Sequence, residues 1–396
     1  MKVEELSARR VLLAAVVAQT AFSIMEQGVP TLTAFVEEDL DLSAAAAGSM
    51  VAVMGVGRLL GFYPAGRAVD IVGERRVLVA GSLVAGVLMA ITAGLPFAAM
   101  LIVFFAIGLF LSTATPAGSK LVYTMFAVER RELAMGIRQA AVPFGGLVAA
   151  IALPLVADHA GWRWALGVSG ALTCVGAAVV LRLAGLGPRA TFRERAPRPP
   201  IRGLLTRDVR LLTAWATVMV GGQYVLVTYF ALDVRDRAHV ETATAALLLV
   251  SVQAGSIAGR IAWGWVADRR PDTRARLLPL TMSGLGVATA VGLAVLPLDG
   301  LLVFGVMGVL AGLTINAWQG LWMTRLTDIV GVEKAGTAAG VCLTFLALGW
   351  IVFTPALGAI ADASSYPVMW GVLAAAIFLG GVGFSRIGTQ AGTASG

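Results

Sequence analysis

The chain has 396 residues, of which 58% are hydrophobic and 13% charged, and its mean hydropathy is +0.85. A soluble chain of this length cannot hide so large an apolar fraction in its own core. The composition therefore excludes a soluble globular protein and requires lipid to cover part of the surface.

Apolar segments recur along the chain at close to the roughly 20 residues that a helix needs to cross about 30 Å of hydrocarbon. We predict an all-α membrane protein with twelve transmembrane helices. In chain order they cover residues 11–35, 44–66, 77–95, 98–123, 133–156, 164–183, 211–232, 243–266, 277–296, 301–325, 335–360 and 368–386. The first run extends beyond a signal-peptide core, so we expect it to be retained.

The basic residues predict the orientation of these helices. Of the 30 lysines and arginines, only Arg163, Arg235 and Arg237 fall in loops predicted to lie outside, and cytoplasmic loops retain positive charge. Both termini are therefore expected in the cytoplasm, and the protein in a bacterial cytoplasmic (inner) membrane. The net charge of +7 is then a topology signal, and no nucleic-acid partner is expected.

Two halves are predicted on either side of a polar, arginine-rich segment over residues 184–210, which reads as a cytoplasmic linker. It separates a six-helix bundle over 1–183 from a second over 211–396. A motif after the second helix recurs after the eighth, which indicates that the bundles are pseudo-symmetric. The motif consists of Gly66, Asp70, Gly73, Arg75 and Arg76 in the first copy, and of Gly264, Asp268, Arg269 and Arg270 in the second.

These two motifs resemble the signature of the major facilitator superfamily between helices 2 and 3 and its weaker second copy. The resemblance extends over nearly the whole chain. It implies two bundles that rock about a central site by alternating access, with the motif latching one gating state. In physical terms, Asp70 is expected to accept hydrogen bonds from a helix N-terminus or to pair with nearby arginines.

Ionisable residues inside the predicted helices are the candidates for a transport site. An isolated charge in hydrocarbon costs several kcal/mol, so each must line water, pair, or meet a charged ligand. The surplus of cations over acids favours an anionic substrate. The candidates are Glu26, Arg58, Lys120, Arg138 and Arg260. Lys120 lies near a cytoplasmic helix end, where it has either a structural role beside Asp70 or a place in the site.

Arg260 is the strongest candidate for a substrate ligand, because Gln253, Ser256 and Arg260 share one helical face. The pattern around Arg260 also resembles helix 8 of monocarboxylate and oxalate transporters, which implies that its guanidinium meets a substrate carboxylate. Oxalate transporters carry a second cation in helix 11, whereas residues 341–350 contain none, and Arg58 is the alternative source. Nitrate porters, with paired arginines, rank lower because their helix 5 signature is incomplete here.

Glu26 shares a face with Gln19 and Ser23 and is predicted to carry the coupling proton. The alternative is a structural ion pair with Arg58. Arg138 has two open interpretations, a substrate contact or a donor to a carbonyl freed by Pro143. Four weaker site candidates are Gln223, Tyr224, Asn316 and Gln319, the last two being expected on one face of a continuous helix. Packing between helices is the alternative explanation for all four.

The predicted function is secondary transport of a small organic anion, in particular a carboxylate, coupled to protons or by exchange with a counter-anion. The alternative is a multidrug/proton antiporter, because Pro143 to Gly146 partly match an antiporter motif. A cationic cavity fits only anionic or neutral drugs. An enzyme is not expected, since no nucleophile and base pair and no metal-ligand cluster stands out, and neither is a cofactor or a metal. We expect a monomer in the lipid bilayer.

Overall fold

A computed structural model describes residues 2–185, 201–270, 276–296 and 300–387, which contain helices and no strands. All twelve predicted transmembrane helices occur, each as one helix or as two consecutive pieces. The first half contains α1 (Lys2–Asp39), α2 (Ala44–Val72), α3 (Glu74–Thr92), α4 (Phe97–Leu111), α5 (Ala114–Met125), η1 (Val128–Arg130), α6 (Arg131–Ala160) and α7 (Trp162–Leu183).

Residues 186–200 of the predicted linker lie outside the described part of the chain, and the end of the linker contains α8 (Ile201–Leu204) and the start of α9 (Arg207–Ala238). The helices of the second half are α8, α9, α10 (Thr242–Leu247), α11 (Leu249–Arg269), α13 (Leu277–Val295), α14 (Leu301–Thr314), α15 (Gln319–Val330), η2 (Val332–Lys334), α16 (Ala335–Ala363) and α17 (Tyr366–Ser385).

Eleven helical stretches in the described residues are long and apolar enough to cross a membrane. The eighth predicted helix, seen as α10 and α11, is not among them. Its polar face, with Gln253, Ser256 and Arg260, lowers the hydropathy of α11, and the same face makes it a candidate for the transport site.

The fourth and tenth predicted helices are interrupted. The fourth ends as α4 at Leu111 and resumes as α5 at Ala114. Pro116 lies in the first turn of α5, where its missing N–H and its ring disfavour a continuous helix through Ser112. The tenth ends as α14 at Thr314 and resumes as α15 at Gln319, without a proline. Each interruption leaves carbonyl oxygens that a side chain can bond.

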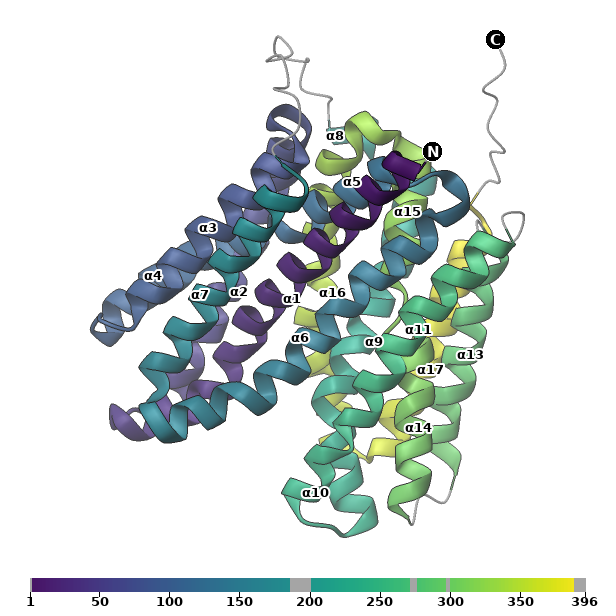
Figure 1. Cartoon of the computed structure of the whole chain (residues 1–396). Helices are drawn as coiled ribbons and strands as arrows, with labels where there is room; N and C mark the ends of the chain where they lie inside the picture. The colour runs from purple at the N-terminus through teal and green to yellow at the C-terminus, as the bar shows by residue number, and fades with distance from the viewer. Residues whose placement is uncertain (1, 186–200, 271–275, 297–299, 388–396) are drawn as a thin grey trace. The chain divides into compact units, whose positions relative to one another are not determined.

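The described residues form two compact units. The first contains residues 2–127, 137–185 and 330–344, in which α2 packs along α4, and α7 packs along α1 and α3 (Figure 1). The N-terminal ten residues of α16 belong to this unit. They pack closely on α2, because Gly340 has no side chain and faces the Phe62 carbonyl oxygen.

The second unit contains residues 128–136, 201–270, 276–296, 300–329 and 345–387 of the described chain. Within it α11 packs along α14, and α17 packs along α13 and α9 (Figure 1). The first turns of α6 belong here and pack on α11, where Gly136 faces the Arg260 carbonyl oxygen. The close approach of α16 to α2 in the first unit thus has a counterpart in the second.

Candidate functional site

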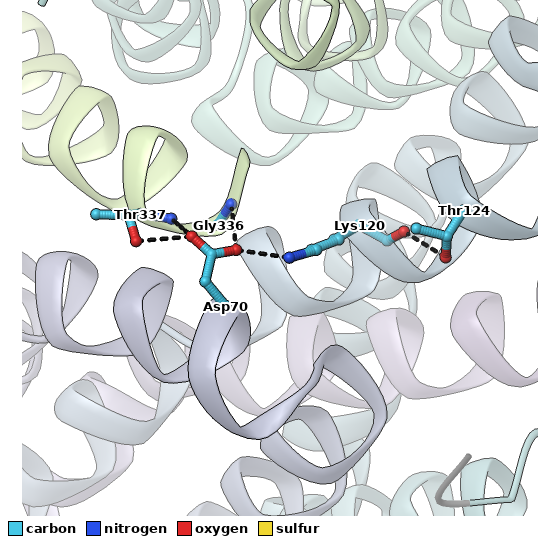
Figure 2. A network of polar contacts seen from close by, with 5 residues as sticks. All are labelled: Asp70, Lys120, Thr124, Gly336 and Thr337. Carbon is cyan, nitrogen blue, oxygen red and sulfur yellow. Dashed lines mark hydrogen bonds and ion pairs between the residues drawn. The ribbon is translucent and has the colours of Figure 1, made fainter. Parts of the chain in front are cut away.

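The first copy of the repeated motif caps a helix. The Asp70 carboxylate, near the end of α2, accepts hydrogen bonds from the backbone nitrogens of Gly336 (3.1 Å) and Thr337 (2.7 Å) at the start of α16. It also accepts one from the Thr337 hydroxyl at 2.6 Å. Lys120 Nζ lies 2.6 Å from Oδ1, the oxygen that also accepts from Gly336 (Figure 2). Asp70 therefore binds a helix N-terminus, as expected, and the paired cation is Lys120.

The second copy of the motif makes the same kind of cap. The Asp268 carboxylate, near the end of α11, accepts hydrogen bonds from the backbone nitrogens of Glu132 and Leu133, each at 2.9 Å. These two residues form the first turn of α6. A carboxylate at a helix N-terminus is favourable because it satisfies free N–H groups and faces the positive end of the helix dipole.

The other motif residues support these two caps. Gly66 and Gly264 face the main chain of the capped helices, at Gly336 and Glu132 respectively. Gly73 has φ +99°, a conformation that favours glycine, at the junction of α2 and α3. Three of the four motif arginines have the following surroundings: Arg75 donates to the Ala184 carbonyl oxygen at 2.5 Å, Arg76 is half-buried, and Arg269 lies over the Trp265 ring at 4.0 Å.

Arg260 is 3% exposed and lies at the interruption of the tenth helix. Its Nε and Nη2 donate to the Asn316 carbonyl oxygen at 3.2 and 3.0 Å, and Nη2 lies 3.4 Å from the Asn316 side-chain oxygen. The Ser256 hydroxyl donates to the same carbonyl oxygen at 3.2 Å. The structure thus brings Arg260, Ser256 and Asn316 together, while Gln253 is half-buried two turns before Arg260 on α11.

Arg138, on α6, is 1% exposed and is held by oxygen atoms from three helices. Its Nη2 donates to Gln19 Oε1 and to the Ala114 carbonyl oxygen, both at 2.7 Å. Its Nη1 donates to Gln139 Oε1 at 2.8 Å and to the Ser119 hydroxyl at 3.1 Å. The Ala114 carbonyl belongs to the start of α5, directly after the interruption of the fourth helix. The Nε of Arg138 is buried and has no hydrogen-bond partner among the described residues.

Glu26 and Arg58 form an ion pair between α1 and α2. Both side chains are about one quarter exposed, at 25% and 27%, and Arg58 also lies 5.4 Å from the centre of the Phe62 ring. An ion pair between Glu26 and Arg58 was the alternative to the proton-coupling role expected from the sequence, and the structure shows this ion pair. Gln19 and Ser23 of the same predicted face bond to each other at 3.3 Å.

The polar residues of the seventh and tenth helices lie together, but not as predicted. Gln319 Nε2 donates to Gln223 Oε1 at 2.5 Å, and Tyr224 packs on Trp350 with ring centres 5.6 Å apart. The expectation that Asn316 and Gln319 share one face of a continuous helix is wrong. The helix is interrupted between them, so Asn316 turns to Arg260 while Gln319 turns to Gln223.

Asp233 is a buried acid that the sequence did not single out, because the seventh helix was expected to end at residue 232. The structure continues α9 to Ala238, and Asp233 is 0% exposed. Its Oδ2 accepts a hydrogen bond from Trp370 Nε1 at 2.8 Å and lies 3.6 Å from Arg237 Nη1. The first unit repeats this contact, since Trp162 Nε1 donates to Asp39 at 2.9 Å.

The fold and the two capped helix starts are those of a twelve-helix membrane transporter. The chain belongs to the Major Facilitator Superfamily, whose family model matches residues 11–354. The superfamily consists of transporters, so the chain is a multi-pass membrane transporter, as the motifs at the ends of α2 and α11 predicted.

Individual relatives agree with this assignment. An uncharacterized MFS-type transporter of Mycobacterium tuberculosis is 28% identical over 346 residues, which cover 82% of this chain and 73% of that protein. Human monocarboxylate transporter 11 is 30% identical over 251 residues, 59% of this chain and 51% of the human protein. The crystal structure of the Escherichia coli fucose:proton symporter superimposes with a TM-score of 0.75 at 14% identity, covering 96% of this chain and 98% of the symporter. That likeness shows the fold.

Proposed function

We propose that this transporter moves a small organic anion, in particular a carboxylate, across the cytoplasmic membrane of a bacterium by alternating access. Transport is coupled to protons or to a counter-anion. Arg138 and Arg260 are the carboxylate ligands, and the Asp70 and Asp268 caps act as latches of the gating cycle.

The observation that carries this proposal is the uncharged surroundings of Arg138. Among the described residues, its guanidinium bonds only to amide, hydroxyl and carbonyl oxygens, and no carboxylate contacts it. A guanidinium remains ionised at neutral pH, and an uncompensated charge in hydrocarbon costs several kcal/mol. A substrate carboxylate would supply the missing negative charge, and the Nε of Arg138 is still available to bind it.

Arg260 supports the same substrate class from the second unit. Its planar fork lies against the Asn316 carbonyl oxygen on a helix interruption, and such a fork matches the two oxygens of a carboxylate. The printed name of the human relative, a monocarboxylate transporter, and the local pattern of helix 8 point in the same direction.

The experiment is uptake of radiolabelled carboxylates into vesicles that contain the purified protein. Arg260→Lys and Arg138→Lys keep the charge but lose the fork, and each is expected to reduce kcat/KM about tenfold or more, since a bidentate contact is replaced by a single one. Arg235→Lys is the matched control, because Arg235 is exposed and pairs with its neighbour Asp236. Equal loss in all three variants, or none, would contradict the assignment.

Drug efflux is the competing outcome of the same experiment. Ligands that bind the native state raise the apparent melting temperature. Stabilisation by lipophilic drugs alone, unaffected by Arg260→Lys, would favour an efflux pump over a carboxylate transporter.

A further inference from the structure

Two buried polar atoms on α15 have no hydrogen-bond partner among the described residues: the indole Nε1 of Trp322 and the side-chain Oε1 of Gln319. Trp322 is 2% exposed. The two residues are three positions apart on one helix, so their side chains lie on the same face. One atom is a hydrogen-bond donor and the other an acceptor.

Two other indoles of the same unit are satisfied, whereas that of Trp322 is not within the described part of the chain. Trp318 Nε1 donates to Gln223 Oε1 at 3.2 Å, and Trp215 Nε1 donates to the Ser283 hydroxyl at 2.9 Å. Gln319 uses its own Nε2 on Gln223. Buried donors and acceptors without partners are rare and need an explanation, and a ligand is one.

These atoms belong to residues that follow, three and six positions along the chain, the residue that Arg260 bonds. The Arg260 guanidinium bonds to Asn316, which comes just before α15. Gly136 faces the Arg260 carbonyl oxygen on one side, and its Cα lies 3.8 Å from a Cβ placed on Gly320 in the first turn of α15. All of these residues belong to one compact unit.

Spacing and surroundings restrict the ligand. Asn316 lies in the helix interruption and is bonded by Arg260, whereas Gln319 at the start of α15 turns to Gln223. A ligand that reaches Arg260 and Gln319 at once would therefore carry its polar group away from its carboxylate. A second indole packs against Trp322, since the rings of Trp318 and Trp322 are centred 6.0 Å apart. Such walls suit a flat, apolar body.

We infer that the substrate is a hydroxylated aromatic carboxylic acid, whose hydroxyl accepts a hydrogen bond from Trp322 Nε1 and donates one to Gln319 Oε1. A hydroxyl is the simplest group that does both at once. The inference rests on the proposed function, since Arg260 holds the carboxylate.

The test compares the binding of benzoate and 4-hydroxybenzoate to the purified full-length protein by calorimetry. We expect 4-hydroxybenzoate to bind about tenfold more tightly, because only the hydroxyl satisfies both buried atoms. Trp322→Phe keeps a ring but removes the donor, and it is expected to bring the ratio of the two affinities close to one. Trp215→Phe is the matched control and keeps the ratio, because that indole already donates to Ser283.

The outcomes separate the two proposals. In one outcome, benzoate binds and its binding is lost in Arg260→Lys, but the hydroxyl group does not raise the affinity or still raises it in Trp322→Phe. This outcome overturns the inference and leaves carboxylate transport standing. If neither acid binds, both are overturned. Should Trp322→Phe fail to fold, Gln319→Met removes the acceptor and is expected to lower the ratio as well, and an unchanged ratio there overturns the inference.

Discussion

A charged side chain inside a membrane protein must replace the water that it has lost. Arg58 does so with a carboxylate, Glu26, whereas Arg138 does so with four neutral oxygens. The first solution cancels the charge and the second leaves it in place. This difference separates Glu26 and Arg58, where a proton can change the pairing, from Arg138, where an anion can bind.

Glu26→Gln tests the proton-coupling role at this scale. The amide can keep a hydrogen bond to Arg58 but can neither bind nor release a proton, so we expect carboxylate uptake to lose most of its dependence on external pH. Glu26→Asp retains a titrating group and is expected to keep that dependence. Uptake measured across a pH series in vesicles decides the matter, and an undiminished slope in Glu26→Gln would assign the pair a structural role.

The two tryptophan–aspartate contacts make a second prediction for single residues. Trp370→Phe leaves the fully buried Asp233 without its indole donor, while Trp162→Phe leaves Asp39, which is exposed and can bond to water. A hydrogen bond to a charged group contributes about 1.5 to 3 kcal/mol when it cannot be replaced. We expect Trp370→Phe to lower the melting temperature clearly more than Trp162→Phe. The reverse order would show that burial does not set the strength of these contacts.

At the scale of the helices, the two aspartates cap different helix starts. Asp70→Asn and Asp268→Asn each remove the negative charge that faces a helix N-terminus, which weakens it by roughly 0.3 to 1 kcal/mol, and Asp70→Asn also leaves Lys120 without this carboxylate. Hydrogen exchange reads this directly. Asp70→Asn should accelerate exchange at Gly336 and Thr337 only, and Asp268→Asn at Glu132 and Leu133 only. Equal acceleration at both helix starts would contradict separate caps.

Helix crossings that depend on glycine give a second prediction for the elements. A Cβ at Gly136 would overlap the Arg260 carbonyl oxygen, and relieving this clash requires the backbone of α11 or α6 to move. Gly136→Ala is therefore expected to lower stability by about 1 to 3 kcal/mol and to reduce transport. Gly371→Ala on α17 is the control, since nothing lies within 4 Å of its added methyl group and alanine favours the helix. Thermal unfolding and uptake measured side by side test the pair.

For the molecule as a whole, hydropathy was sufficient to predict twelve helices, and a bond to a helix N-terminus was one of the two expectations for Asp70. Long-range contacts decided the rest. No proline marks the helix interruption before Gln319. The Asn316 carbonyl oxygen in this interruption is bonded by Arg260, which lies 56 residues earlier in the chain. The polar sequence from Asp233 to Arg237 is typical of a loop, yet the helix continues through it. Trp370, from a distant segment, donates a hydrogen bond to the Asp233 carboxylate there. Hydropathy cannot register such partners.

Arg138 also has an electrical consequence. Because neutral oxygens hold its guanidinium, the empty transporter carries a positive charge in its interior that a bound carboxylate would cancel. Moving one elementary charge through 100 mV changes the free energy by about 2.3 kcal/mol. The reorientation of the empty protein, and not that of the loaded one, should then respond to membrane voltage. We expect the uptake rate to change with an imposed potassium diffusion potential when reorientation of the empty protein limits the transport cycle. Arg138→Gln is expected to abolish that response.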